Sequence, residues 1–126
     1  MADPHPLFDT LVAAARAFNS AQYFETHEIL EDALDDVPDA EWDLFIGLIQ
    51  IAVGYHKATQ QLWSGAAAML ERALAKVEPL PNEAGGINLE LLRSRARADA
   101  AALRAGTFDL QALERNPPRL QITSTK

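Results

Sequence analysis

The sequence contains no cysteine, and this absence excludes several kinds of site at once. Disulfide bonds, thiolate zinc sites and cysteine nucleophiles cannot form. A bound metal ion would therefore have to use histidine nitrogen, carboxylate oxygen or carbonyl oxygen, and the chain has only three histidines.

Long hydrophobic runs are also missing. The longest uncharged apolar stretch, residues 44–56, has 13 residues, whereas a membrane-spanning helix needs about 20. The first ten residues, MADPHPLFDT, contain no cationic segment followed by an apolar one, so we expect no secretory signal. We therefore expect a cytoplasmic protein that has no membrane partner.

Basic residues are scarce in the first half of the chain. Residues 1–50 carry eleven acidic side chains and only Arg16 as a basic one, whereas residues 51–126 are mildly basic. The formal net charge is -7, and a negative field repels phosphate, so we do not expect nucleic-acid binding. The two halves have opposite charge and could pair head to tail in a homo-oligomer.

No segment shows the apolar/polar alternation of a half-buried strand, while alanine, leucine, glutamate and arginine dominate. We predict an all-α fold, a compact five-helix bundle, with a short helical turn after Asp109. The chain length fits one domain, with a core over about residues 7–105 and a partly ordered C-terminal extension over 107–126. The predicted helices cover about residues 7–18, 22–34, 40–61, 64–77 and 88–104. Asp39 and Asn88 are the predicted N-caps of the third and fifth helices, Gly106 ends the fifth, and residues 78–86 form a loop.

A weak internal repeat appears when the sequence is shifted by 40 residues. Residues 28–34 (EILEDAL) then align with residues 68–74 (AMLERAL), and Tyr23 aligns with Trp63. This spacing predicts that the first four helices form two antiparallel helix pairs that resemble tetratricopeptide-like hairpins.

Polar side chains are predicted to enter the core from two helices. Helical spacing places Tyr23, His27 and Glu31 on the apolar face of the second helix, with Glu28 at its edge. The third helix is apolar all round from Leu44 to Tyr55 except for Gln50, and His56 ends one of its apolar stripes.

Two interpretations of these polar residues remain open, because a buried polar group must be paired. The first is a structural hydrogen-bond network that fixes the packing of the two helices. The second is a site in which His27, Glu31 and His56 hold zinc, manganese or iron, or in which Gln50 and Tyr23 help to bind a small molecule. If the protein is an enzyme, Glu28 is the candidate general base of a metal-dependent hydrolase.

Two weaker patterns carry less chemistry. The string HEILE over residues 27–31 is similar to the zinc-protease helix motif with its second histidine replaced, and nothing else in the sequence favours a peptidase. Arg93, Arg97 and Arg104 share one face of the fifth predicted helix, where we expect a solvated surface or ion pairs with the acidic second helix.

The residues above also carry a family resemblance. Phe18-Asn19, YFETHEILE (residues 23–31), FIGLIQIA (45–52) and Tyr55-His56-Lys57 resemble the DUF309 family of small prokaryotic proteins over about residues 8–80. The resemblance implies an all-helical fold and places the marked polar residues of the family on His27, Glu28, Glu31, Gln50 and His56. It implies no activity.

We therefore carry two hypotheses forward. In the first, His27, Glu31, Gln50 and His56 form a buried pocket for a metal ion or small ligand. In the second, the protein is a non-enzymatic helical module for protein interaction or dimerisation, and the polar cluster is purely structural.

Overall fold

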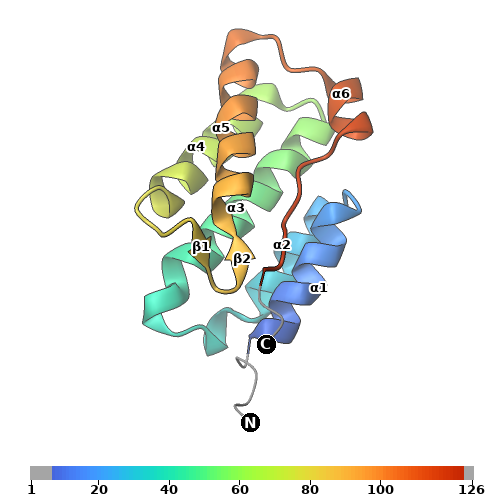
Figure 1. Cartoon of the computed structure of the whole chain (residues 1–126). Coiled ribbons are helices and arrows are strands. Elements are labelled where there is room, and N and C mark those ends of the chain that lie inside the picture. Colours follow the sequence, from blue (N-terminus) through green and yellow to red (C-terminus); the bar gives the residue numbers. More distant parts are fainter. Residues whose placement is uncertain (1–6, 124–126) are drawn as a thin grey trace.

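A computed structural model describes residues 7–123 as a predominantly helical protein (Figure 1). The elements in chain order are α1 (Phe8–Asn19), α2 (Tyr23–Asp32), the 3₁₀ turns η1 (Leu34–Asp36) and η2 (Asp39–Glu41), α3 (Trp42–Thr59), α4 (Trp63–Val77), β1 (Glu83–Ala84), β2 (Ile87–Asn88), α5 (Leu89–Ala105) and α6 (Leu110–Arg115). The predicted all-α class is therefore confirmed in outline. The described part of the chain has six α-helices, and the last of them, α6, lies where a short helical turn was predicted after Asp109.

The helices pack mainly against their neighbours in sequence, α1 on α2, α2 on α3, α3 on α4 and α4 on α5. The apolar helix α3 lies in the middle of this series, and it buries Phe45, Ile51, Ala52 and Tyr55 completely. Burial on several sides explains why its sequence is apolar around most of its circumference. Within residues 7–123, no helix is both long and apolar enough to cross a membrane.

The turns that follow α1 and α3 have the same backbone geometry. Ala21 and Gln61 both have a φ of 62°, in the left-handed region. In each turn the amide of the next residue donates a 2.9 Å hydrogen bond back into the helix, from Gln22 to Ala17 O and from Leu62 to Lys57 O. These are Schellman endings, and they recur at the 40-residue spacing of the sequence repeat.

Several helix boundaries follow the predicted signals, and one does not. The Asn88 side chain accepts a 3.0 Å hydrogen bond at the start of α5, and Gly106 ends that helix with a φ of 75°. Asp39, predicted as the N-cap of the third helix, instead begins the 3₁₀ turn η2, and α3 starts at Trp42. The short 3₁₀ turn therefore replaces the first turn of the predicted helix.

The segment after α6 returns along the other helices toward the start of the chain (Figure 1). Asn19, at the end of α1, exchanges two hydrogen bonds with the backbone of Leu120, whose side chain is buried. Ile87 of the small hairpin β1–β2 forms an antiparallel bridge with Ile122. The hairpin begins in the segment predicted to be a loop (78–86) and ends at the predicted N-cap Asn88, and it joins the C-terminal segment to the rest of the fold.

Candidate functional site: a pocket between α2 and α3

Helix α2 presents a different face to the core from the one that the sequence suggested. Its buried residues are Tyr23, Thr26 and Leu30, whereas Phe24 and Glu31 are exposed. Thr26 tolerates burial because its hydroxyl donates a 2.8 Å hydrogen bond to the carbonyl of Gln22, one turn earlier. The prediction that Glu31 enters the core is wrong, and the helix is rotated so that Thr26 takes the inward position.

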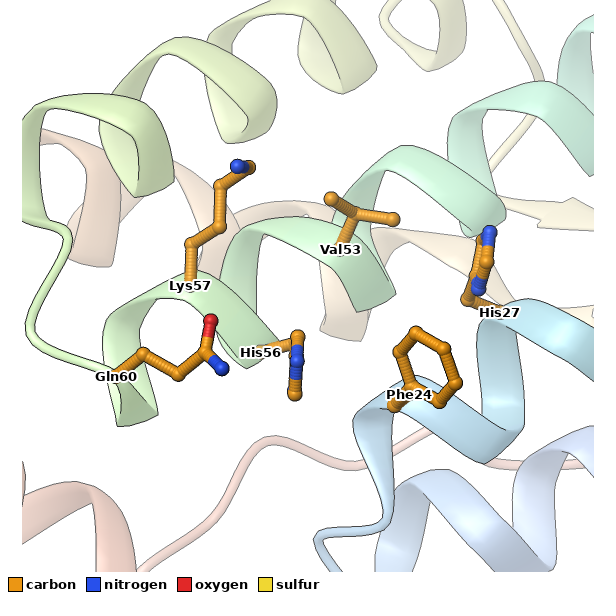
Figure 2. A pocket seen from close by; sticks show the side chains of 6 residues that line it. All are labelled: Phe24, His27, Val53, His56, Lys57 and Gln60. Atoms are coloured by element: carbon orange, nitrogen blue, oxygen red, sulfur yellow. The ribbon is translucent and has the colours of Figure 1, made fainter.

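His27 and His56 nevertheless face the same pocket, which lies between α2 and α3 and has a volume of about 210 Å³ (Figure 2). Both side chains are partly exposed. The residues that line the pocket are Phe24, His27, Val53, His56, Lys57 and Gln60. Spacing brings these residues together, since positions 24 and 27 of α2 and positions 53, 56, 57 and 60 of α3 each recur at three- or four-residue intervals.

The ring of Phe24 contacts both imidazoles. Its centroid lies 5.4 Å from that of His27 and 5.3 Å from that of His56, with 49° between the planes in each case. Figure 2 shows the Phe24 side chain between the two histidines. Phe24 is 49% exposed although it is a large apolar side chain. The pocket therefore offers three ring surfaces that solvent or a ligand can reach.

His27 is held in place by Glu31, one turn further along α2. The imidazole Nε2 donates to Glu31 Oε2 over 3.0 Å, and the carboxylate itself is more than half exposed. Because a carboxylate accepts hydrogen bonds, this bond leaves Nδ1 as the free ring nitrogen. Nδ1 is buried and has no hydrogen-bond partner within the described part of the chain.

The other residues of the predicted site lie elsewhere. Glu28, the candidate general base, is exposed and does not line the pocket. Gln50 lines a separate groove between α3 and α4. Within residues 7–123, no three histidine or acidic side chains are grouped so that they could hold a metal ion. Of the predicted metal ligands, His27 is hydrogen-bonded to Glu31, and His56 is separated from His27 by the Phe24 ring.

Tyr23 belongs to a second polar cluster, deeper in the core, that the sequence did not reveal. Tyr55 donates a 2.5 Å hydrogen bond to Asp99, and Arg95 donates to the same carboxylate oxygen over 2.9 Å. Tyr23 packs against Tyr55 with ring centroids 5.5 Å apart, and its hydroxyl has no partner in the described residues. The only available signal was the four-residue spacing of Arg95 and Asp99, which is typical of a helical ion pair.

Burial dominates the electrostatics of the two phenols. Desolvation raises the pKa of Tyr23 to about 12, although the nearby Arg95 acts in the opposite direction. The pKa of Tyr55 is raised well above its ordinary value by burial and by the adjacent Asp99 carboxylate. Both phenols therefore stay neutral at physiological pH, which suits a structural cluster.

The basic face of α5 pairs with α4 and the loop after it rather than with α2. Arg97 pairs with Glu78, and Arg104 pairs with Glu71, whose pKa is lowered by that guanidinium. Arg93 is not on a solvated face at all, because it is only 3% exposed. The expectation of ion pairs with α2 is therefore wrong, since α5 packs against α4.

The chain matches a model of a protein family. Residues 11–69 match the family model described as a domain of unknown function, DUF309. This range includes α2, α3 and every residue that lines the α2–α3 pocket. No curated protein matches the chain.

Proposed function

Residues 11–69 belong to the DUF309 family, and on that premise we propose that this protein binds a small organic ligand, with a planar ring and an anionic group, in the α2–α3 pocket. One observation carries the proposal: the half-exposed ring of Phe24 lies between two imidazoles that line the same pocket. Covering the faces of aromatic side chains is energetically favourable. A flat ligand that covers these rings would supply that burial.

The size of the pocket favours a small ligand. Sites for drug-sized molecules have volumes of about 300–1,000 Å³, and this pocket has about 210 Å³. A single ring with one substituent fits the smaller volume. Apolar rings with a few polar groups are the ordinary composition of small-molecule sites.

The polar lining favours an anionic group on that ligand. Among the described residues that line the pocket, Lys57 is a cation, Gln60 carries an amide donor, and none is acidic. The unpartnered Nδ1 of His27 is an acceptor, because Nε2 carries the proton that is donated to Glu31, so it would accept a hydrogen bond from an N–H or O–H group of the ligand. A carboxylate would accept charge-assisted hydrogen bonds from the Lys57 ammonium and the Gln60 amide.

We further infer that α1–α2 and α3–α4 are two antiparallel, tetratricopeptide-like hairpins. The matching Schellman turns at Ala21 and Gln61 support this inference. So do the close approaches of Gly47 to Val77 and of Gly54 to Leu70, in which residue numbers rise along α3 as they fall along α4. The pocket then lies between the second helix of one hairpin and the first helix of the next.

The experiment is a titration with benzoate, followed by the NMR signals of the histidine rings. Benzoate carries the ring and the charge, benzamide carries the ring without the charge, and acetate carries the charge without the ring. We expect benzoate to shift the His27 and His56 signals at the lowest concentration, benzamide to be weaker and acetate to have no effect. Equal shifts with acetate, or none with benzoate, would contradict the proposal.

Two variants distinguish binding in the pocket from nonspecific binding to exposed apolar side chains. Phe24→Ala removes the ring between the imidazoles, and Leu91→Ala removes a comparably exposed apolar side chain on α5. Only Phe24→Ala should weaken benzoate binding. A parallel titration with zinc distinguishes an organic ligand from a metal ion, because zinc would shift the same imidazoles without needing Phe24. Failure of all probes would favour the interaction-module hypothesis.

A further inference from the structure

The groove between α3 and α4 carries polar groups that the proposed function does not use. It has a volume of about 430 Å³ and is more open than the α2–α3 pocket. Its lining residues are Asp43, Gln50, Arg72, Ala75, Lys76 and Pro79. Four of these six side chains are charged or carry an amide, so the groove differs sharply in chemistry from the ring-lined pocket.

Gln50 is the exceptional residue of this groove. It interrupts the apolar surface of α3, and its Oε1 is buried with no hydrogen-bond partner in the described part of the chain. A buried acceptor without a donor costs about 1–3 kcal/mol. A bound molecule that supplies a hydroxyl or amide hydrogen would remove this cost.

Arg72 and Lys76 form the cationic wall of the groove, one turn apart on α4. Neither makes an ion pair with any described residue, whereas Arg93, Arg95, Arg97 and Arg104 of α5 all do. Glu71, which precedes Arg72 in the sequence, pairs with Arg104. The two cations of the groove are therefore available to an anion.

We propose that the α3–α4 groove binds a phosphate ester of a polyhydroxylated molecule, of which a sugar phosphate is the simplest example. Arg72 and Lys76 take the phosphate oxygens, as arginine and lysine do in phosphate sites. Gln50 Oε1 and the Asp43 carboxylate accept hydrogen bonds from hydroxyl groups. A hydroxyl donor and a phosphate on one molecule satisfy both halves of the lining.

The groove favours such an ester over a simple anion for two reasons. Its volume lies in the range of about 300–1,000 Å³ that suits a small metabolite. The Asp43 carboxylate repels an anion that has no hydroxyl groups to offer, whereas it becomes a hydrogen-bond acceptor for a polyol. Both acceptors thus discriminate between phosphate esters and inorganic anions.

The test is calorimetric titration of the full chain with glucose 6-phosphate, glucose, inorganic phosphate and sulfate. We expect glucose 6-phosphate to bind at least about tenfold more tightly than any of the other three. Arg72→Ala should weaken its binding at least about fivefold. Arg115→Ala, which removes an exposed arginine of α6, should leave the affinity unchanged.

Gln50→Met tests the unpartnered acceptor without depending on the cations. This variant keeps the shape of the side chain and removes the amide, so it should weaken glucose 6-phosphate without altering the weak binding of inorganic phosphate. Its melting temperature should equal or exceed that of the wild type, because the uncompensated buried oxygen is gone. Equal affinity for sulfate and glucose 6-phosphate, equal losses in Arg72→Ala and Arg115→Ala, or no binding would overturn the proposal.

Discussion

Arg93 shows how a single charged residue can be essential to packing. Its guanidinium is buried and donates hydrogen bonds to the backbone carbonyls of Val77 and Leu80 and to the Asn82 side chain, at 2.7–2.9 Å. These acceptors lie at the end of α4 and in the loop that follows it. The arginine therefore satisfies carbonyls that the end of a helix leaves without partners.

We predict that Arg93→Ala lowers the free energy of unfolding by about 2–4 kcal/mol, because it leaves several buried acceptors without a donor. Arg97→Ala is the matched control on the same helix, since Arg97 pairs with Glu78 at the surface. That change should cost less than about 1 kcal/mol. Urea denaturation of both variants measures the difference, and equal losses would mean that the buried hydrogen bonds contribute nothing.

The buried tyrosines predict a stability loss at alkaline pH. A pKa raised to about 12 means that folded Tyr23 holds its proton more tightly than the unfolded chain does. The resulting stabilisation is complete below about pH 10 and is lost as the pH rises toward 12. Tyr23→Phe should reduce this loss, with little change at pH 7, because the hydroxyl has no partner.

Tyr55→Phe provides the contrast at pH 7. It removes the hydrogen bond to Asp99 and should lower the free energy of unfolding by about 1–3 kcal/mol. Denaturation curves of the wild type and both variants at pH 7 and pH 11 test the pair. The account fails if Tyr23→Phe is as destabilising at neutral pH as Tyr55→Phe.

The sequence predicted the residues of the site only in part, and the reason lies in α2. His27 and His56, both predicted for the site, line the same pocket between two adjacent helices. The sequence did not show that Thr26, rather than Glu31, faces the core. The Thr26 hydroxyl is hydrogen-bonded within its own helix, so its burial leaves no unpaired polar group. The polarity of a side chain alone does not show whether its polar group is hydrogen-bonded within the helix.

At the scale of elements, the helix ends follow chemistry that is visible in the sequence. Asn88 and Gly106 were recognisable as the signals that bound α5, and the structure uses both. The turns after α1 and α3 were harder to recognise because their left-handed positions carry Ala21 and Gln61 instead of glycine. The hairpin β1–β2 was missed because strands of two residues have no detectable periodicity.

The left-handed turns predict stabilising substitutions. Gln61→Gly and Ala21→Gly should each raise the free energy of unfolding by about 0.5–1.5 kcal/mol, because glycine adopts a positive φ without the steric cost of a Cβ. Gln60→Gly is the control, since Gln60 has a φ of -92° and gains nothing from glycine. Thermal unfolding measures all three, and stabilisation by Gln60→Gly alone would contradict the assignment of the turns.

The contact between α3 and α4 depends on glycine in a different way. A Cβ at Gly47 would clash with a methyl carbon of Val77, and one at Gly54 would lie 2.8 Å from Leu70. Gly47→Ala and Gly54→Ala should each cost about 1–3 kcal/mol despite the better helix propensity of alanine. Urea denaturation should show both losses.

Gly65→Ala is the control for these two changes. Its Cβ would meet the flexible Lys57 side chain at 3.2 Å, so the variant should be neutral or more stable. If all three alanine variants gained stability, the close approach of α3 and α4 would be disproved.

At the scale of the whole molecule, the charge asymmetry of the sequence maps onto different helices. The acidic first half forms α1, α2, the 3₁₀ turns and the start of α3, while the paired arginines Arg93, Arg95, Arg97 and Arg104 lie on α5. These arginines find their carboxylates on α4, on α5 and in the loop after α4, so the two halves do not neutralise each other through α2. Composition predicted the asymmetry, but only packing shows which elements pair.

The same distinction applies to the two binding surfaces. Gln50 was expected in one pocket with His27 and His56, because Gln50 and His56 lie on the same apolar helix, α3. A helix in the middle of the fold presents different faces to different partners, so His56 faces α2 whereas Gln50 faces α4. Helical periodicity gives the angle of each side chain but not the helix that packs against it.

The most direct test of the central claim is a crystal structure of the protein soaked with 4-bromobenzoate, in which the bromine is located by its anomalous scattering. The account predicts a bromine peak in the α2–α3 pocket, with the ligand ring against Phe24 and the imidazole of His56. The Phe24→Ala crystal, soaked in the same way, should lack the peak. A bromine peak only at other places on the surface, with the pocket open to solvent, would contradict the account.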